Sequence, residues 1–193
     1  MPAIRSGIGK GENDMRSVSV TQCLSILDRF KGISYRVLMQ AAERGTRVHK
    51  YSLAWVKGLY LPVPDDIAES VEGFKRWFEL MIDEVLCVEE PLEDRSLCLT
   101  GRVDLIARIR GERLFSVIDL KASTVDWSVG LQLAAYHEMA QKQFRRKLGT
   151  RFALPIQKDG SIKAVPFRDP NDWPIFLGVL SAYNHSRKMK EAA

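Results

Sequence analysis

Two aspartates and one lysine interrupt segments of this chain that are otherwise apolar. Asp104 lies in the first of two neighbouring β-branched runs, Asp119 lies in the second, and a short turn at Gly111 separates them. Two such runs around a glycine turn predict a β-hairpin. Lys121 follows Asp119 by two residues, so the alternation of a strand places both side chains on one face. A carboxylate inside a sheet is costly unless it is paired, hydrogen-bonded or bound to a metal.

These three side chains could carry out hydrolytic chemistry. Two carboxylates and an ammonium group in one place can hold Mg²⁺ or Mn²⁺ and place a water molecule beside it. The alternative is a structural ion pair of the aspartates with Arg102 or Lys121. Because each aspartate lies in an apolar strand beside the other, the pattern favours metal ligation by Asp104 and Asp119.

The same residues resemble the core of a known enzyme family. Asp104, followed by the triplet Asp-Leu-Lys at 119–121, is similar to the central motif of the PD-(D/E)XK nucleases. The segments 45–49 (Gly-Thr-Arg-Val-His) and 132–136 (Gln-Leu-Ala-Ala-Tyr) narrow the resemblance to the RecB-like branch, which includes phage-type exonucleases. Four elements in the family's order are much more specific than an Asp-x-Lys triplet alone.

The resemblance implies a role for each residue of this core. Metal ligation is expected from His49, Asp104, Asp119 and the backbone carbonyl of Leu120. Lys121 would orient or deprotonate the attacking water and stabilise the charge that develops in the transition state. A lone histidine on a helix is more often structural, but His49 closes the family's pattern, so contact with the site is expected.

Three further residues are expected at the edge of the site. Gln132 and Tyr136 are four apart on a predicted helix and share a face, and the resemblance has them contacting water at the metal or the scissile phosphate. The alternative for both is the polar edge of an amphipathic helix. Glu89 ends the first predicted strand, where a third acidic group often lies in this superfamily, and a solvated glutamate is the alternative. The resemblance covers roughly residues 18 to 168, with Val103 where the family name has Pro.

A basic run follows the helix that carries Gln132. Arg145, Arg146 and Lys147 lie in a stretch without acidic residues and suit contacts with a DNA backbone. A solvated helix end, favoured by the helix dipole, is an equal alternative.

Three other residues have no such context. Trp127 is expected in the core, with stacking on a terminal base as the alternative. His137 and His185 are expected at the surface.

The composition suits a single domain without a membrane partner. The chain has 193 residues, 46% of them apolar; residues 18–193 are assigned to one domain and residues 1–17 to a flexible tail. No apolar run could span a bilayer and the N-terminus lacks a signal-peptide core, which predicts a cytoplasmic protein. The resemblance implies that the cell is bacterial or phage-infected. Three scattered cysteines predict reduced thiols. Some RecB-like nucleases hold an iron–sulfur cluster on four cysteines, most of them after the core; because no cysteine follows Cys98, no cluster is expected here.

Charge is distributed unevenly along the chain. The net charge is +5, yet residues 65–94 carry eleven acidic residues against Lys75 and Arg76. The rest of the chain is therefore strongly basic and could present a basic face to phosphates. Solubility is the alternative reason for such a balance.

The order of predicted elements indicates an α/β (α+β) fold with a central mixed sheet flanked by helices, a restriction-endonuclease-like core. Gly45 lies inside a predicted helix, where it costs about 1 kcal/mol relative to Ala, so either the helix bends or another segment approaches it closely. The expected helices are 22–27, 34–57, a helix from 65, 129–146 and 169–188, and the expected strands are 85–88, 97–109, 114–121, 151–157 and 162–167.

The favoured function is a metal-dependent deoxyribonuclease using Mg²⁺ or Mn²⁺. We expect an exonuclease of phage or bacterial recombination and repair that acts on DNA. A single-strand annealing or recombination protein is a candidate additional partner. The protein could also form a homo-oligomer. The first alternative is an endonuclease on branched or nicked DNA with the same site. The second is a DNA-binding module that has lost catalysis, but such a protein should have lost Asp104, Asp119 or Lys121, and all three are present.

Overall fold

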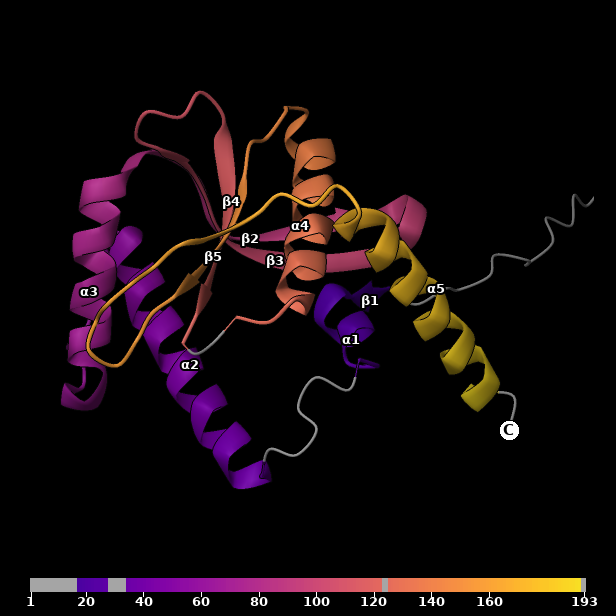
Figure 1. The fold of residues 1–193 in the computed structure, drawn as a ribbon, viewed down its shortest axis with the longest axis horizontal. Coiled ribbons are helices and arrows are strands. Elements are labelled where there is room, and N and C mark those ends of the chain that lie inside the picture. Colours follow the sequence, from indigo (N-terminus) through magenta and orange to yellow (C-terminus); the bar gives the residue numbers. More distant parts are fainter. Residues whose placement is uncertain (1–16, 28–33, 123–124, 192–193) are drawn as a thin grey trace, which may run out of the picture.

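A computed structural model describes residues 17–27, 34–122 and 125–191 of the chain. The predicted tail therefore lies outside the described residues, apart from Ser17, as does the predicted break at residues 31–33. A mixed sheet of six strands forms the centre, with two helices on one face and three on the other (Figure 1). The predicted mixed sheet flanked by helices is confirmed.

The elements follow the predicted order, with shifted ends and with β1 and η1 as additional short elements. The helices are α1 (Val20–Leu24), α2 (Tyr35–Val56), α3 (Asp65–Met81), α4 (Ser128–Phe144) and α5 (Asp172–Glu191), and the short 3-10 helix is η1 (Arg95–Leu97). The strands are β1 (Val18–Ser19), β2 (Ile82–Asp94), β3 (Leu99–Ile109), β4 (Phe115–Lys121), β5 (Arg151–Pro155) and β6 (Val165–Phe167).

Strand β3 organises the sheet because it has three partners. Antiparallel β2 pairs with it from Leu99 to Ile109, so β1 and β4 must share its other edge. Antiparallel β4 takes the part from Leu105 to Arg108, whereas parallel β1 takes Leu99 and Thr100. The strand positions 101–104 lie between these two partners. The sheet therefore opens beside Asp104.

Helix α4 connects β4 to the parallel strand β5 and returns along the sheet. Its first turns consequently lie near the carboxyl end of β4, and its last turn lies near the start of β5. The β5–β6 hairpin closes the sheet, and Ile156 N donates to Lys121 O beyond the strands. This topology brings residues of α4 to the end of the strand that carries Asp119 and Lys121.

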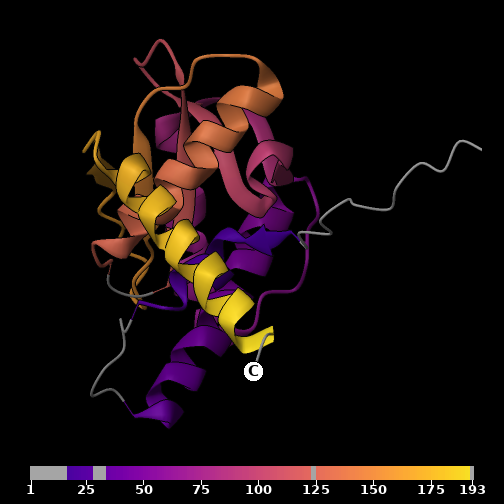
Figure 2. The same ribbon diagram turned by 90° about the vertical axis from the view of Figure 1, so that its right-hand side faces the viewer.

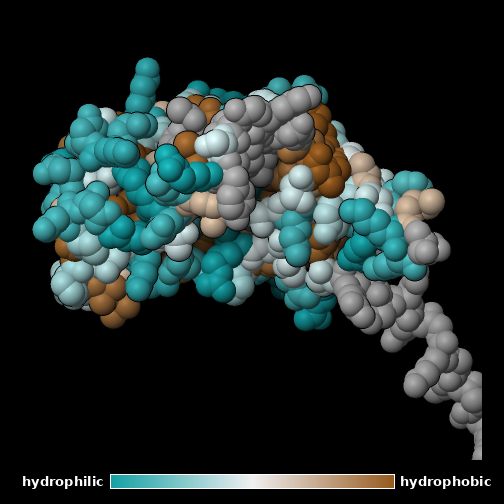
Figure 3. Space-filling model, turned by 90° about the horizontal axis from the view of Figure 1, so that it is seen from below, coloured by the Kyte–Doolittle hydropathy of each residue, from teal (hydrophilic) through white to brown (hydrophobic). Residues whose placement is uncertain are grey.

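Two apolar clusters hold the layers together. Helices α1, α4 and α5 pack on one face of the sheet around Phe176, Leu131 and Val117, and Figure 2 shows α5 lying across this side. Helices α2 and α3 pack on the other face around Phe74 and Leu120. Seen from below, the surface on the α2–α3 side is mainly hydrophilic (Figure 3).

Several local features differ from the sequence-based expectations. Strand β2 is much longer than the predicted segment 85–88, because two register irregularities interrupt its alternation of apolar and polar residues. Helix α1 begins earlier than expected, since Ser19 and Gln22 form a capping box. At Gly45 the expected close approach is not found: a Cβ there would lie 3.5 Å from that of Ala122, an ordinary van der Waals contact. In the described part of the chain, no helix is both long and apolar enough to cross a membrane.

Candidate active site

The carboxyl end of β4 carries a buried ion pair. Lys121 Nζ lies 2.6 Å from Asp119 Oδ2, and 4% of the Asp119 side chain is exposed against 24% for Lys121. Gln132 of α4 contacts both groups. Its amide oxygen accepts a hydrogen bond from Lys121 at 3.0 Å, and its amide nitrogen donates to Asp119 Oδ1 at 3.3 Å. Gln132 thereby fixes the orientation of both charged side chains.

Asp104 joins this pair from β3, where the sheet opens. Its Oδ2 accepts a hydrogen bond from the backbone N–H of Leu120 at 2.8 Å and lies 3.4 Å from His49 Nδ1. The N–H and C=O of one strand residue point to the same side, so the Leu120 carbonyl is directed toward this gap as well. Strands β3 and β4 and helix α2 thus bring the five predicted core residues together.

Tyr136 completes the network from the next turn of α4. Its hydroxyl accepts a hydrogen bond from Gln132 Nε2 at 3.2 Å. The buried ring packs against Gly101, where an added Cβ would lie only 2.7 Å from a ring carbon of Tyr136. Sequence reasoning gives Gly101 no role, because this contact depends on how α4 packs on β3. A side chain at Gly101 would push Tyr136 away and disturb Gln132.

Burial and neighbouring charges shift the pKa values of the site residues in opposite directions. Burial raises the pKa of Asp119, and the nearby charge of Asp104 adds to this effect against the attraction of Lys121. Burial lowers the pKa of His49, but the hydrogen bond and charge of Asp104, with the charge of Asp119, outweigh burial and raise it overall. The pKa of Tyr136 is raised mainly by burial, so its phenol stays protonated. Tyr136 can therefore donate a hydrogen bond as well as accept one.

The chemistry of the site fits a hard divalent cation. Oxygen donors are the ligands that Mg²⁺ and Mn²⁺ prefer. Asp119 Oδ2 is buried and forms no aligned hydrogen bond with any described residue, although Lys121 lies beside it. Among the described residues, however, no three His, Cys, Asp or Glu side chains converge as a ready-made cage. Hydrogen bonds and the charge of Lys121 instead hold His49, Asp104 and Asp119. A bound cation would have to replace part of these contacts.

Arg44 links α2 to the catalytic end of β4, and sequence reasoning missed it. Its guanidinium donates to the backbone oxygen of Ala122 at 2.7 Å and to Ser70 Oγ at 2.6 Å. Ser70 of α3 in turn donates to Gln157 O in the β5–β6 turn at 2.9 Å. Because Arg44 precedes His49 by five residues on α2, this chain of bonds fixes the helix that carries His49 against the strand that carries Lys121.

Glu89 lies at the edge of the site in an unusual conformation. The register of β2 and β3 places it opposite Asp104, since the flanking pairs are Val88–Leu105 and Glu90–Val103. Its φ of 50° is rare for a residue other than glycine. Its carboxylate pairs with Lys57, the residue that follows α2, at 2.5 Å. Glu89 and His49 line the same hollow of about 440 Å³, so Glu89 borders the site.

Other predicted residues lie elsewhere. Arg145 and Lys147 follow the end of α4, and the Arg146 guanidinium lies 5.0 Å from the ring of Phe115, at the opposite end of β4 from Lys121. The structure therefore does not bring this basic run to the site.

Two expectations outside the site are wrong. Trp127, expected in the core, is 63% exposed because it precedes the first turn of α4. His137, expected at the surface, is packed with Nε2 3.1 Å from Gly149 O. His185 is exposed, as expected.

Comparisons with known proteins were made for both sequence and fold. The model of the PD-(D/E)XK nuclease superfamily matches residues 33–175. A comparison with curated proteins gives no match. Among 22 matching chains of solved structures is a protein of Eubacterium rectale described as a "putative exonuclease". Its TM-score is 0.57 at 14% identity, over 98% of this chain and 86% of that one, which shows a shared fold.

Proposed function

The chain belongs to the PD-(D/E)XK nuclease superfamily, and on this premise we propose that it is a metal-dependent deoxyribonuclease acting on DNA ends. The observation that carries the proposal is the convergence of Asp104, Asp119 and Lys121 where β3 and β4 separate. Two carboxylates and an ammonium group at one opening of a sheet suit hydrolysis of a phosphodiester.

Each residue has a proposed role in that reaction. Asp104, Asp119, the Leu120 carbonyl and His49 would hold Mg²⁺ or Mn²⁺, which supplies Lewis acidity and lowers the pKa of water. Lys121 orients the attacking water and stabilises the negative charge that develops on the phosphate. These roles are supported by the distances that link Lys121 to Asp119 and Leu120 to Asp104.

Residues of α4 and β2 would act around this core. Gln132 holds the Lys121 ammonium through its amide oxygen, and Tyr136 can donate a hydrogen bond toward a phosphate oxygen because its phenol stays protonated. Glu89 is proposed as an outer acidic group, released from Lys57 when substrate binds. Its left-handed backbone conformation supports a functional role, since strained residues concentrate at sites.

The proposal for action on ends rests on the resemblance of residues 45–49 and 132–136 to RecB-like nucleases and on the described neighbour with the same fold. A role in phage or bacterial recombination and repair, in the cytoplasm and beside a recombination protein, belongs to the same proposal. The endonuclease alternative uses the same residues, so the test must separate the modes of attack.

A comparison of closed and linear DNA separates them. Covalently closed duplex DNA and the same molecule after one cut are incubated with protein and Mg²⁺ or Mn²⁺. We expect the linear form to lose nucleotides progressively while the closed circle survives. Cutting of the circle as fast as the linear form would replace the exonuclease proposal with the endonuclease one. No cutting of either form in either metal would reject both.

A further inference from the structure

A line of exposed basic residues runs along the β5–β6 hairpin away from the active site. Lys158, Lys163 and Arg168 form this basic strip, and none makes an ion pair with another described residue. The strip begins at the turn beside Ala122, in a hollow of about 670 Å³ that Arg44 also lines. The hairpin then crosses the molecule to the start of α5 (Figure 1). The strip therefore connects the catalytic end of the sheet with its opposite end.

At its far end the strip enters a hollow of about 890 Å³. Arg113 of the β3–β4 turn, Lys147 after α4 and Arg168 contribute cations to its lining, and Trp173 contributes an aromatic surface. We call this the distal hollow. Three basic side chains without ionic partners around one concave surface can each contact a phosphate group.

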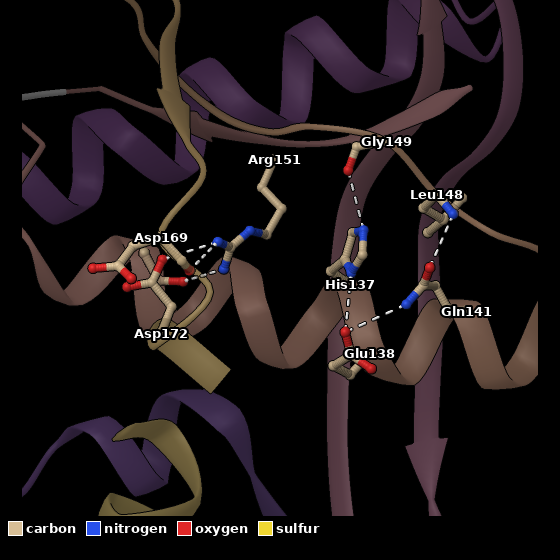
Figure 4. A network of polar contacts seen from close by, with 9 residues as sticks. His137, Glu138, Gln141, Leu148, Gly149, Arg151, Asp169 and Asp172 are labelled. Carbon is tan, nitrogen blue, oxygen red and sulfur yellow. Dashed lines mark hydrogen bonds and ion pairs between the residues drawn. The ribbon is translucent and has the colours of Figure 1, made fainter. Parts of the chain in front are cut away.

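Several residues that line the distal hollow belong to the network of polar contacts in Figure 4. Buried Arg151 donates to Gly130 O and Asp169 O and pairs with Asp172 at 3.0 Å. His137 holds the loop after α4 through Gly149 O. Because Arg151 is fully engaged within the protein, ligand contacts are left to the three cations in the lining, on walls that are already fixed.

Acidic residues also line the distal hollow. Glu138 is held by His137 and Gln141, and Asp169 by Asn171. These hydrogen bonds do not cancel the carboxylate charges, so Glu112, Glu138 and Asp169 equal Arg113, Lys147 and Arg168 in number. The cations are distinguished by forming no ion pair with any described residue, which leaves each of them available for contact with a phosphate group.

We propose that the basic strip and the distal hollow hold the phosphate backbone of DNA beyond the scissile bond. This inference rests on the proposed nuclease function. The distal hollow contains Leu114 and Arg151, at the start of β4 and β5, whereas Lys121 ends β4. At about 3.3 Å per residue, β4 spans about 20 Å, which corresponds to about six nucleotides of one duplex strand. Only substrates longer than this reach the hollow.

Another explanation exists for the exposed cations of the hairpin. β6 is an edge strand, and lysines near an edge prevent pairing with other chains. In that case the cations would affect association of the protein with itself but not its use of DNA. Arg113 and Lys147 come from other segments and face the same hollow, which the edge explanation does not require.

The test is the dependence of cleavage on substrate length. The double variant Lys163→Gln/Arg168→Gln is compared with the native protein and with Lys188→Gln/Lys190→Gln, a matched loss of two exposed charges on α5. Hairpin DNAs with one free end carry stems of about 4 or about 30 base pairs, shorter and longer than the six-nucleotide span. We expect the ratio of kcat/KM on the long stem to that on the short stem to fall severalfold in the first variant and to remain native in the control.

The salt dependence of DNA binding gives a second test. It is measured on the same proteins after the additional change Asp119→Asn. The slope of log affinity for the long stem against log salt should become less steep by about 2 in the first variant, because two phosphate contacts are lost. An unchanged ratio and slope would overturn the inference and favour the edge explanation or an acidic protein partner. Failure to cleave either stem in the native protein would instead reject the proposed function.

Discussion

Asp119 lies at the centre of the proposed site, and its ionised form lowers the stability of the folded protein. Burial disfavours its ionised form, and Asp104 adds repulsion, so the pKa of Asp119 is raised above its ordinary value of 3.8. A raised carboxyl pKa contributes stability that is complete below the ordinary value and is lost as pH rises through the folded value. At neutral pH the ionised group therefore destabilises the protein relative to an uncharged amide of the same shape.

Asp119→Asn is accordingly expected to raise the melting temperature of the metal-free protein at pH 7. A gain of about 1 kcal/mol corresponds to roughly 2–4 °C for a chain of this size. The gain should shrink as pH falls, because protonation of Asp119 in the native protein removes the charge that the amide replaces. Thermal unfolding followed by circular dichroism measures both effects. Asp83→Asn, an exposed change in β2, is the control; a lower melting temperature for Asp119→Asn would contradict the expectation.

His49 offers a separate test because it contacts Asp104 but not Lys121. If it ligates the metal, His49→Ala should reduce activity by roughly 10- to 100-fold at limiting Mn²⁺ and recover part of it at high Mn²⁺. The measurement is a titration of activity with Mn²⁺. An unchanged metal dependence together with a lower melting temperature would assign His49 a structural role instead.

Sequence alone indicated the charged core but not the residues that hold it. Asp104, Asp119 and Lys121 stand out because charge inside an apolar strand needs a reason. Arg44 does not stand out, since an arginine on a helix is common and its acceptor, Ala122 O, is 78 residues away. Gly101 does not stand out in the sequence either, because its role is to leave room for the ring of Tyr136. Such roles appear only when distant segments are packed together.

Among the elements, β3 shows most clearly what a sequence pattern can and cannot predict. Its apolar run predicted the strand almost to the residue, yet the division of one edge between β1 and β4 depends on tertiary pairing. That division creates the opening beside Asp104. Strand β2 was predicted too short because bulges break its alternation, and the same irregular strand carries Glu89 with a positive φ.

Arg44 holds helix α2 against the end of β4 and against α3. Arg44→Met would leave Ala122 O and Ser70 Oγ without their donor, at a cost of about 1–3 kcal/mol. We expect kcat to fall about tenfold or more with a much smaller change in KM, because His49 and Lys121 lose their fixed separation. Steady-state kinetics well below the melting temperature measure this.

Two further variants test that Arg44 acts by positioning. Arg44→Lys keeps one donor and should restore part of kcat, whereas Arg36→Met changes an exposed arginine on the same helix and should have no effect. Equal activity of Arg44→Met and native protein, or a loss seen only near the melting temperature, would show that Arg44 contributes to stability alone.

On the scale of the whole molecule, the acidic segment of the sequence forms α3 and β2, where Asp66 pairs with Arg47 and Asp83 with Arg108. The cations of the basic strip and the distal hollow lie on the β5–β6 hairpin and at the turns at one end of the sheet. The turn of the hairpin packs against α3 through Ser70 and Gly73. We therefore expect DNA to follow the hairpin from that turn toward the distal hollow, with binding that weakens as salt rises.

The central claim is that Asp104, Asp119 and Lys121 form a metal-dependent nuclease site. The most direct measurement is release of nucleotides from end-labelled linear duplex DNA with Mg²⁺, with Mn²⁺ and with a chelator, by native protein and by Asp119→Asn and Lys121→Ala. We expect release in either metal, none with the chelator, and at least a roughly hundredfold loss in both variants, which should stay folded and still retain DNA. Near-native release by a folded Asp119→Asn protein would contradict the account.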